Sequence, residues 1–156
     1  MWLSAVVTAS TSKSNERHSL NMQGLYNALI RTHHITSRKK VAALKRAADS
    51  HQCSVLLRSG GCPGIMYVEG QGKERVEMWV DVVRKLRYKD FQLVTRPGPV
   101  EMEGETELKG REKTKTKKEI TGLALGLDEV DSVKEFGAIM AKREVWNWWR
   151  RGMGYA

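Results

Sequence analysis

The stretch CSVLLRSGGCPGIMYVEGQG, residues 53–72, decides the fold. Two short apolar runs flank a Gly-Gly-Cys-Pro-Gly connector at residues 60–64. Because glycine tolerates positive φ angles and Pro63 cannot donate a ladder hydrogen bond, the pattern predicts two strands joined by a turn. The connector lacks the GxxxxGK[ST] and GxGxxG patterns of phosphate-binding loops, so we interpret it as a turn and not as a ligand cradle.

Helices are predicted on both sides of this pair of strands. Downstream, KERVEMWVDVVRKLRY (residues 73–88) repeats apolar residues at helical spacing, the clearest periodicity in the chain. Its apolar stripe consists of Val76, Trp79, Val80, Val83 and Leu86. Upstream, a helix is predicted from about residue 37 to 50, with Thr36 or Ser37 as its N-cap. Its apolar stripe consists of Val41, Leu44 and Ala48.

Two outer strands complete the order of elements. The segment LYNALIRTHHI (residues 25–35) fits a strand or a helix by pattern alone, whereas FQLVTR (residues 91–96) indicates a strand that Pro97 and Pro99 end. If residues 25–35 are extended, the order is the split βαβ arrangement. We therefore predict an α+β, ferredoxin-like βαββαβ fold, in which two helices cover one face of a four-stranded antiparallel sheet. The other face is expected to stay open unless something covers it.

The remaining segments are predicted to be a tail, an insertion and a final helix. Residues 1–23, rich in serine and threonine, are predicted to be a disordered N-terminal tail. A single domain then spans residues 24–154, with a charged flexible insertion at about 97–127. A final helix is predicted from about 128 to 150. Its tryptophan-rich end, WNWWRR (residues 146–151), is interpreted as core packing rather than base stacking.

The composition points to a soluble globular protein with an anionic partner. The 156 residues are 40% hydrophobic and 29% charged, and the formal net charge is +9. No apolar run approaches the roughly 18 residues of a membrane span. The two cysteines, Cys53 and Cys62, form no CxxC pair and are too few for a disulfide scaffold, so reduced intracellular thiols are expected. The positive charge suggests nucleic acid or an acidic surface, although a basic surface without a ligand has the same charge.

The motif THHITSRKK, residues 32–40, is the first candidate site. In a strand, consecutive side chains point to opposite faces, so His33 and His34 are not expected to reach one metal ion. No HExxH motif or cysteine pair completes a metal site, and no carboxylate lies nearby in sequence for acid–base chemistry, although a distant one could fold close. We therefore predict no metal, no cofactor and no catalytic residue here, and a structural role for the histidines.

The cations that follow the histidines are predicted to contact phosphates. Arg38, Lys39 and Lys40 lie in the first turn of the predicted helix, where the dipole disfavours cations by about 0.3–1 kcal/mol each. A phosphate would be held there by free backbone N–H groups and by these side chains together. Lys45 and Arg46, further along the helix, are predicted to contribute in the same way. The alternative is that all of these cations point into water.

Strand alternation predicts a second set of nucleic-acid contacts on the open face of the sheet. Leu25, Asn27, Leu29, Arg31 and His33 share one face of the first strand, the more polar of its two faces, and we place that face outward. From the other strands, Arg58, Tyr67 and Arg96 are placed on the same face. Cations for phosphates and an aromatic ring for stacking suit a single-strand platform. Glu69 on this face argues against it, and a register error of one residue would exchange the two faces.

Several stretches resemble a known family. They are HHI at 33–35, GCPGIMYVEG at 61–70, MWVDVVRKLRYKDFQLV at 78–94 and EFGAIMAKREVWNWWRRGMG at 135–154. In this order they resemble the C-terminal domain of the spliceosomal pre-mRNA-processing factor three, which is shared with certain RWD-domain-containing proteins. The resemblance implies a ferredoxin-like fold. For the spliceosomal members it also implies binding to an RNA duplex and its adjoining single strand within a small nuclear ribonucleoprotein.

Three functions remain open from the sequence. The first is a non-enzymatic RNA-binding domain of the pre-mRNA-splicing type, located in the nucleus, with the cytoplasm and then the mitochondrion as alternatives. Its predicted contact residues are Arg31, His33, Arg38, Lys39, Lys40, Lys45, Arg46, Arg58, Tyr67 and Arg96. The second is a protein-interaction module with an RWD-like or ubiquitin-pathway partner and no nucleic-acid role. The third is a small hydrolase, because fold does not fix function.

Overall fold

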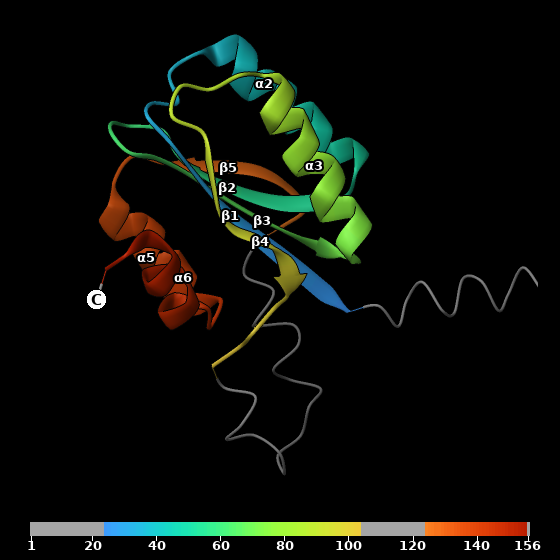
Figure 1. Ribbon diagram of the computed structural model, residues 1–156, viewed down its shortest axis with the longest axis vertical. Helices are drawn as coiled ribbons and strands as arrows, with labels where there is room; N and C mark the ends of the chain where they lie inside the picture. The colour runs from blue at the N-terminus through green and yellow to red at the C-terminus, as the bar shows by residue number, and fades with distance from the viewer. Residues whose placement is uncertain (1–23, 104–123, 156) are drawn as a thin grey trace, which may run out of the picture.

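A five-stranded mixed sheet forms the centre of the molecule, with strand order β4-β1-β3-β2-β5 (Figure 1). The computed structural model describes residues 24–103 and 124–155. The strands are β1 (Leu25–Thr32), β2 (Cys53–Arg58), β3 (Gly64–Gln71), β4 (Gln92–Pro99) and β5 (Gly126–Val130). The pairs among β1 to β4 are antiparallel, and β5 runs parallel to β2. The predicted βαββαβ core is therefore confirmed, with one strand more than the sequence predicted.

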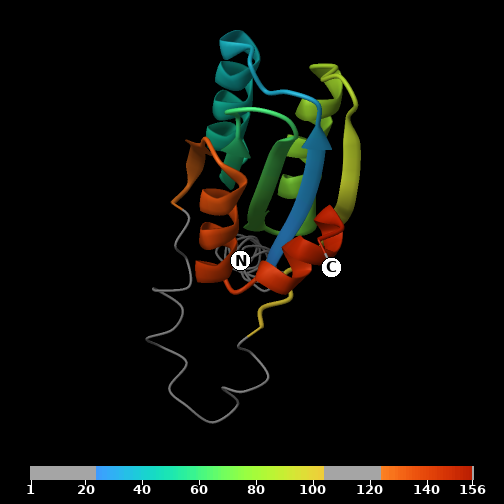
Figure 2. The ribbon, with the colours of Figure 1, turned by 90° about the vertical axis from the view of Figure 1, so that its left-hand side faces the viewer.

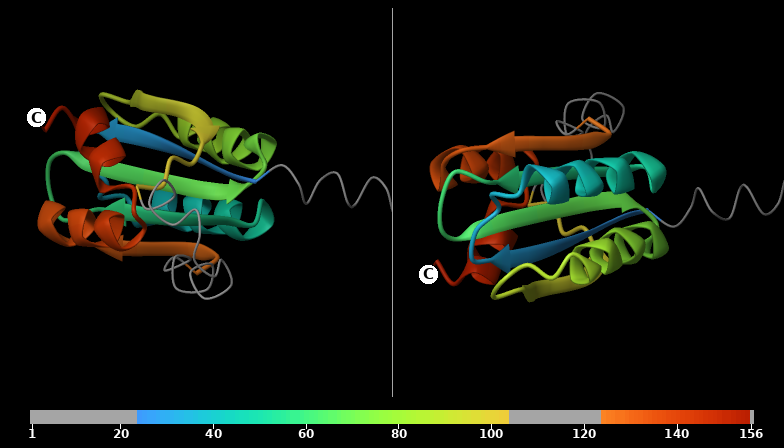
Figure 3. Two further views of the ribbon diagram at one scale, coloured as in Figure 1. Left: turned by 90° about the horizontal axis from the view of Figure 1, so that it is seen from below. Right: turned by 90° about the horizontal axis from the view of Figure 1, so that it is seen from above.

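Two helices cover one face of the sheet, as the sequence predicted (Figure 3, right). They are α2 (Arg38–Ser50) and α3 (Lys73–Lys85). Ser37 is the N-cap of α2 and its side chain accepts a hydrogen bond from the backbone N–H of Lys40. The two helices are tied together where the indole Nε1 of Trp79 donates to the carbonyl oxygen of Leu44, 3.2 Å away. Their buried stripes pack on β1, β2 and β3 to form the first hydrophobic core.

The C-terminal region differs from the single helix that the sequence predicted over about 128–150. It consists of β5 followed by α5 (Val133–Lys142) and α6 (Trp146–Met153). Ser132 caps α5 by accepting a hydrogen bond from the N–H of Glu135, so the helix starts after the strand. Glu144 has a φ of +61°, a left-handed conformation that breaks the chain into two helices. The predicted tail over 1–23 and most of the predicted insertion lie outside the described residues.

The second face of the sheet is covered, so the predicted open face is wrong (Figures 1 and 2). Helix α5 contacts β2 and β5, and α6 contacts β4. The strand side chains Leu29, Leu56, Ile65 and Tyr67 are completely buried in a second core that the two C-terminal helices share. The helices contribute Phe136, Met140, Val145, Trp148, Trp149 and Met153 to this core. Alternation assigned the side chains of β1 to β3 to the correct faces of the sheet. The face that was predicted to be open is covered by Trp148 and Trp149 of α6.

Strand β4 departs from regular alternation. Its pairing with β1 shifts register around Leu29, because Leu29 pairs with Thr95 while its neighbour Ile30 pairs with Leu93. The irregularity is a β-bulge, which re-aims the side chains that follow it. Arg96 consequently lines a groove with Glu77 and other residues of α3, on the side opposite α6. Placing Arg96 on the same face as Tyr67 is therefore wrong.

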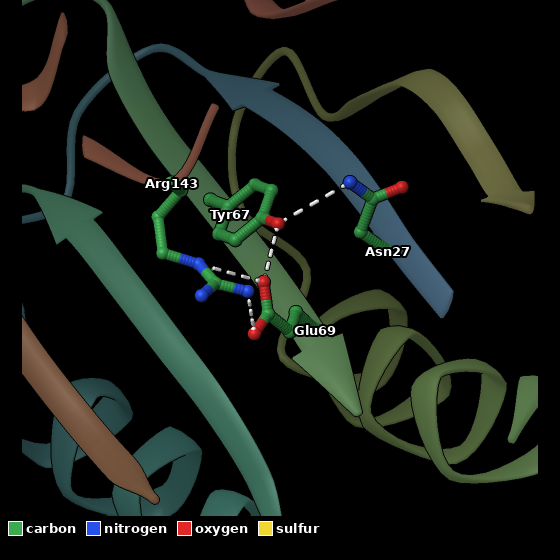
Figure 4. A network of polar contacts seen from close by, with 4 residues as sticks. All are labelled: Asn27, Tyr67, Glu69 and Arg143. Atoms are coloured by element: carbon green, nitrogen blue, oxygen red, sulfur yellow. Dashed lines mark hydrogen bonds and ion pairs between the residues drawn. The ribbon is translucent and has the colours of Figure 1, made fainter. Parts of the chain in front are cut away.

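A buried ion pair fastens the C-terminal helices to the sheet (Figure 4). Arg143, directly after α5, donates from Nε and Nη2 to the two carboxylate oxygens of Glu69 on β3. Both side chains are almost fully buried, with 0% and 4% of their surface exposed. Tyr67 donates from its hydroxyl to Glu69 Oε1 at 2.7 Å and accepts from the side-chain amide of Asn27 at 3.2 Å. Burial, followed by the charge of Glu69, raises the pKa of Tyr67, so this hydroxyl keeps the proton that it donates.

Gly64→Ala is expected to destabilise the fold by about 1–3 kcal/mol. Gly64 begins β3 opposite Thr32, and an added Cβ would collide with Thr32 Oγ1 and lie 2.7 Å from Cγ1 of Ile35. Ile35 is completely buried and stiff at χ1, so it cannot move aside cheaply. Urea denaturation measures the loss. The matched control is Gly98→Ala, whose Cβ would meet, among the described residues, only the carbonyl oxygen of Arg96 at 3.7 Å. Equal urea midpoints for the two variants would contradict this packing.

Candidate functional site

Three segments that are rich in lysine and arginine meet at one end of the molecule, where β1 ends, α2 begins and α3 ends (top in Figure 1). Two contacts bring these segments together. The backbone N–H of His33 donates to the carbonyl oxygen of Lys89 at 2.9 Å, and the ammonium of Lys40 lies 4.8 Å from the ring centre of Tyr88. We call this surface the basic end. Its cations are Arg31, Arg38, Lys39, Lys40, Arg84, Lys85, Arg87 and Lys89.

Acidic side chains neutralise only part of the basic end. Arg38 forms a bidentate salt bridge with Glu129 of β5, with N–O distances of 3.0 and 2.9 Å. The hydrogen bond from Arg38 lowers the pKa of Glu129 and raises that of Arg38, so both groups stay charged and bind each other. Within the described residues, no carboxylate forms an ion pair with Lys39 or Lys40. These two lysines therefore remain available to an external anion, whereas Arg38 is held by its partner.

Helix α2 extends the positive surface away from the basic end. Lys45 and Arg46 are both exposed. The charge of Lys45 is one of the smaller causes that lower the pKa of Glu129, so Lys45 lies on the side of α2 that faces β5. No ion pair holds Arg46 within the part of the chain that the structure describes. Of the predicted phosphate contacts on α2, Arg38, Lys39, Lys45 and Arg46 are exposed and Lys40 is half-buried. Within the described residues, Lys39, Lys40 and Arg46 have no carboxylate partner.

The predicted single-strand platform does not form, because its members lie in different surroundings. Arg31 is exposed and His33 is half-buried, and both line a cavity of about 230 Å³ beside the basic end. Arg58 donates to the carbonyl oxygens of Asp131 and Pro63, at 3.0 and 2.9 Å, and so closes the turn between β2 and β3. Tyr67 is completely buried under α5 and α6 and cannot stack on a base. The aromatic part of the predicted site is therefore wrong.

The structure brings together a cluster that the sequence prediction missed, formed by His33, His34 and Cys62. Strand β1 ends at Thr32, so His33 and His34 do not alternate across a sheet, and their ring centres lie 4.2 Å apart. The expectation that they point to opposite faces is wrong for this reason. Cys62 Sγ lies 3.7 Å from His33 Nδ1, and one nitrogen or sulfur atom of each residue lies within 4.8 Å of the others. Thr32 pairs with Gly64 in the sheet, and Cys62 stands two residues before Gly64. A correct prediction of this register would have placed Cys62 beside the histidines that follow Thr32.

The cluster does not form a catalytic relay. Asp90 Oδ2 lies 3.5 Å from His33 Nδ1, the same nitrogen that Cys62 approaches. A nucleophile–histidine–carboxylate relay needs the two partners on different ring nitrogens, so that one holds the ring while the other gives up its proton. In this orientation of the His33 ring, Cys62 and Asp90 are therefore not linked through it as a relay.

The two cysteines are expected to differ sharply in reactivity. Cys62 is exposed, whereas burial raises the pKa of Cys53 to about 11. Since the thiolate is the reactive form, iodoacetamide at pH 8 should modify Cys62 and spare Cys53, as measured by peptide mass spectrometry. In urea both cysteines should react. Equal modification of both in the native protein would contradict the burial of Cys53 under β3 and α3.

Comparisons with known proteins leave the family open. A scan against models of known protein families matches none of them, and a search among curated proteins finds no significant match. Among the described residues, every helix is too short or too polar to cross a membrane. The resemblance to the spliceosomal domain family remains a prediction carried by the quoted motifs.

Proposed function

We propose that this chain is a non-enzymatic RNA-binding domain that holds phosphates with its basic end. The observation that carries the proposal is the convergence of lysines and arginines from the start of α2 and the end of α3. Apart from Arg38, these cations form no ion pair with the described residues. Phosphate contacts of this kind supply most of the affinity of sequence-independent binding. The formal charge of +9 supports the same class of partner. The resemblance to the spliceosomal domain favours RNA over other polyanions and a nuclear location over a cytoplasmic one.

The mode of binding that the geometry favours is contact with the phosphate backbone. Lys39 is exposed at the first turn of α2, and Lys85, Arg87 and Lys89 are exposed across from it. Lysine and arginine side chains position a protein on a nucleic acid without reading its bases. Stacking on unpaired bases is not part of the proposal, because Tyr67, Trp148 and Trp149 are buried. A duplex, with phosphates at regular spacing, is the partner that this surface fits.

The proposal is tested by the salt dependence of RNA binding. Fluorescence anisotropy would follow the full chain binding to a labelled RNA stem with a single-stranded overhang, between 50 and 300 mM salt. If about four to six phosphates are contacted, the logarithm of the affinity should fall against the logarithm of salt with a slope of roughly −4 to −5. Binding that is absent at 50 mM salt, or that does not change with salt, would contradict the proposal.

The protein-interaction alternative has less support in the structure. It depends on an open sheet face or on the tryptophan-rich end as an apolar docking surface. Both surfaces are largely buried against each other. Among the described residues, the large apolar side chains that stay exposed are dispersed over different elements and do not form one core of an interface. They are Met78, Leu125, Trp146 and Tyr155. This alternative predicts binding to a protein with little dependence on salt.

A further inference from the structure

We propose that His33, His34 and Cys62 form a binding site for a zinc-type divalent metal ion. Each residue offers one ligand atom, and the three atoms lie within 4.8 Å of one another. Two imidazole nitrogens and a thiolate are the donor set that Zn²⁺ and Co²⁺ favour, whereas Mg²⁺ and Ca²⁺ prefer oxygen. The inference does not depend on RNA binding, because none of the three ligands is needed for the phosphate contacts of α2.

The backbone around the cluster is held in place from several sides. The N–H of His33 donates to the carbonyl oxygen of Lys89, and the carbonyl oxygen of His33 accepts from the N–H of Gly64 at 3.1 Å. Arg58 donates to the carbonyl oxygen of Pro63, next to Cys62, at 2.9 Å. The two segments that carry the ligands, 33–34 and 62, are therefore fixed relative to each other by hydrogen bonds. We therefore expect rotation of the side chains alone to complete the site.

Those rotations are small. With metal–nitrogen bonds of about 2.0–2.1 Å and a metal–sulfur bond of about 2.3 Å, ligand atoms in a tetrahedral site lie about 3.3–3.6 Å apart. Cys62 Sγ and His33 Nδ1 are already 3.7 Å apart. His34 and Cys62 are exposed and His33 is half-buried, so the three side chains can close by the remaining distance without disturbing the core. Three protein ligands leave the fourth position for solvent or an external ligand.

Charged side chains near the proposed site both repel and attract a metal ion. The cations Arg31 and Lys89 of the basic end repel a divalent ion. The thiolate of Cys62 and the carboxylate of Asp90, which lies 3.5 Å from His33 Nδ1, attract it. Asp90 is thus a source of negative charge beside the same nitrogen that Cys62 approaches. Because a single negative charge a few ångströms from a divalent ion contributes about tenfold in affinity, Asp90→Asn should weaken binding by about tenfold. Loss of a direct ligand should weaken it by at least about 100-fold.

The test uses Co²⁺ as the probe, because thiolate ligation to Co²⁺ adds a charge-transfer absorption that histidine and carboxylate ligands do not give. Co²⁺ is titrated into the reduced full chain and into three variants, Cys62→Ser, His34→Ala and His51→Gln. His51 is a histidine at the far end of α2 and serves as the matched control. Circular dichroism verifies that each variant is folded, which the exposure of Cys62 and His34 leads us to expect.

The expected result is a charge-transfer band in the wild type and in His51→Gln that Zn²⁺ abolishes by displacing Co²⁺. The band should be absent in Cys62→Ser, and His34→Ala should need at least about 100-fold more Co²⁺ to reach half of it. A folded wild-type protein without the band would overturn the proposal. So would a band that persists in Cys62→Ser, or one that His51→Gln removes.

Discussion

Arg143→Ala should lower the free energy of unfolding by about 3–5 kcal/mol, the largest stability effect we expect from a single substitution in this chain. The change removes the partner of Glu69, whose carboxylate is buried between β3 and the C-terminal helices. Tyr67 would still donate a hydrogen bond to the remaining carboxylate, but an incompletely compensated charge in the interior is costly. Urea denaturation followed by tryptophan fluorescence measures the loss, since Trp148 and Trp149 lie in the affected core.

Two further variants distinguish the loss of the ion pair from the loss of side-chain volume as the cause of the lower free energy of unfolding. Lys142→Ala changes the exposed neighbour of Arg143 and should cost less than about 0.5 kcal/mol. Glu69→Leu with Arg143→Met replaces the pair by apolar side chains and should recover most of the stability. Arg143 Nη1 has no hydrogen-bond partner within the described residues, so the native pair is itself incompletely satisfied. If Arg143→Ala lowered the free energy of unfolding as little as Lys142→Ala, the ion pair would not be what holds α5 and α6 against the sheet.

Lys39→Glu with Lys40→Glu should weaken binding to the RNA stem by about 30- to 150-fold at 100 mM salt. Each reversal exchanges an attraction of about 1 kcal/mol to a nearby phosphate for a repulsion of similar size, and salt reduces the sum to about 2–3 kcal/mol. The fold should tolerate the change, because both positions lie in the first turn of α2, where a negative charge is favoured by the helix dipole. The contact of Lys40 with the Tyr88 ring is lost, at a cost of about 0.5–1 kcal/mol.

A matched variant controls for net charge. Lys134→Glu with Lys142→Glu makes the same change in total charge on α5, which lies on the other side of the sheet from α2 (Figure 1). Both lysines are exposed, so the fold should be unaffected. If binding depends on the basic end, this control should lose only a fewfold in affinity. Equal losses of affinity in the two double variants would indicate that the net charge of the whole protein attracts the RNA and that the basic end is not a specific site.

The sequence was sufficient for the part of the fold that local patterns specify. The stripe from Val76 to Val83 identified α3, and the glycine-rich turn at 60–64 identified the β2–β3 pair. Alternation also placed Tyr67 and Glu69 on one face correctly. These elements are predictable because their periodicity and turn chemistry depend on residues close in sequence.

The sequence was insufficient where the structure depends on distant contacts. Strand β5 is short and half-exposed, and its parallel pairing with β2, a strand about 70 positions away in sequence, makes it a strand. The covering of Tyr67 follows from the pair between Glu69 and Arg143, which are 74 positions apart. The bulge in β4 moved Arg96 to the other face, and the turn after Thr32 brought His33 to Cys62. No local sequence pattern predicts these contacts, so the aromatic part of the predicted site was wrong. The α2 cations apart from the half-buried Lys40 were found exposed.

The central claim is that the basic end holds RNA phosphates, and the salt slope of the charge-reversal variant tests it most directly. Anisotropy titrations of the same RNA stem give the slope for the wild type and for Lys39→Glu with Lys40→Glu. Since each phosphate contact contributes about 0.9 to the slope, losing two contacts should make it shallower by about 2. Slopes and affinities that agree between the two proteins would contradict the claim.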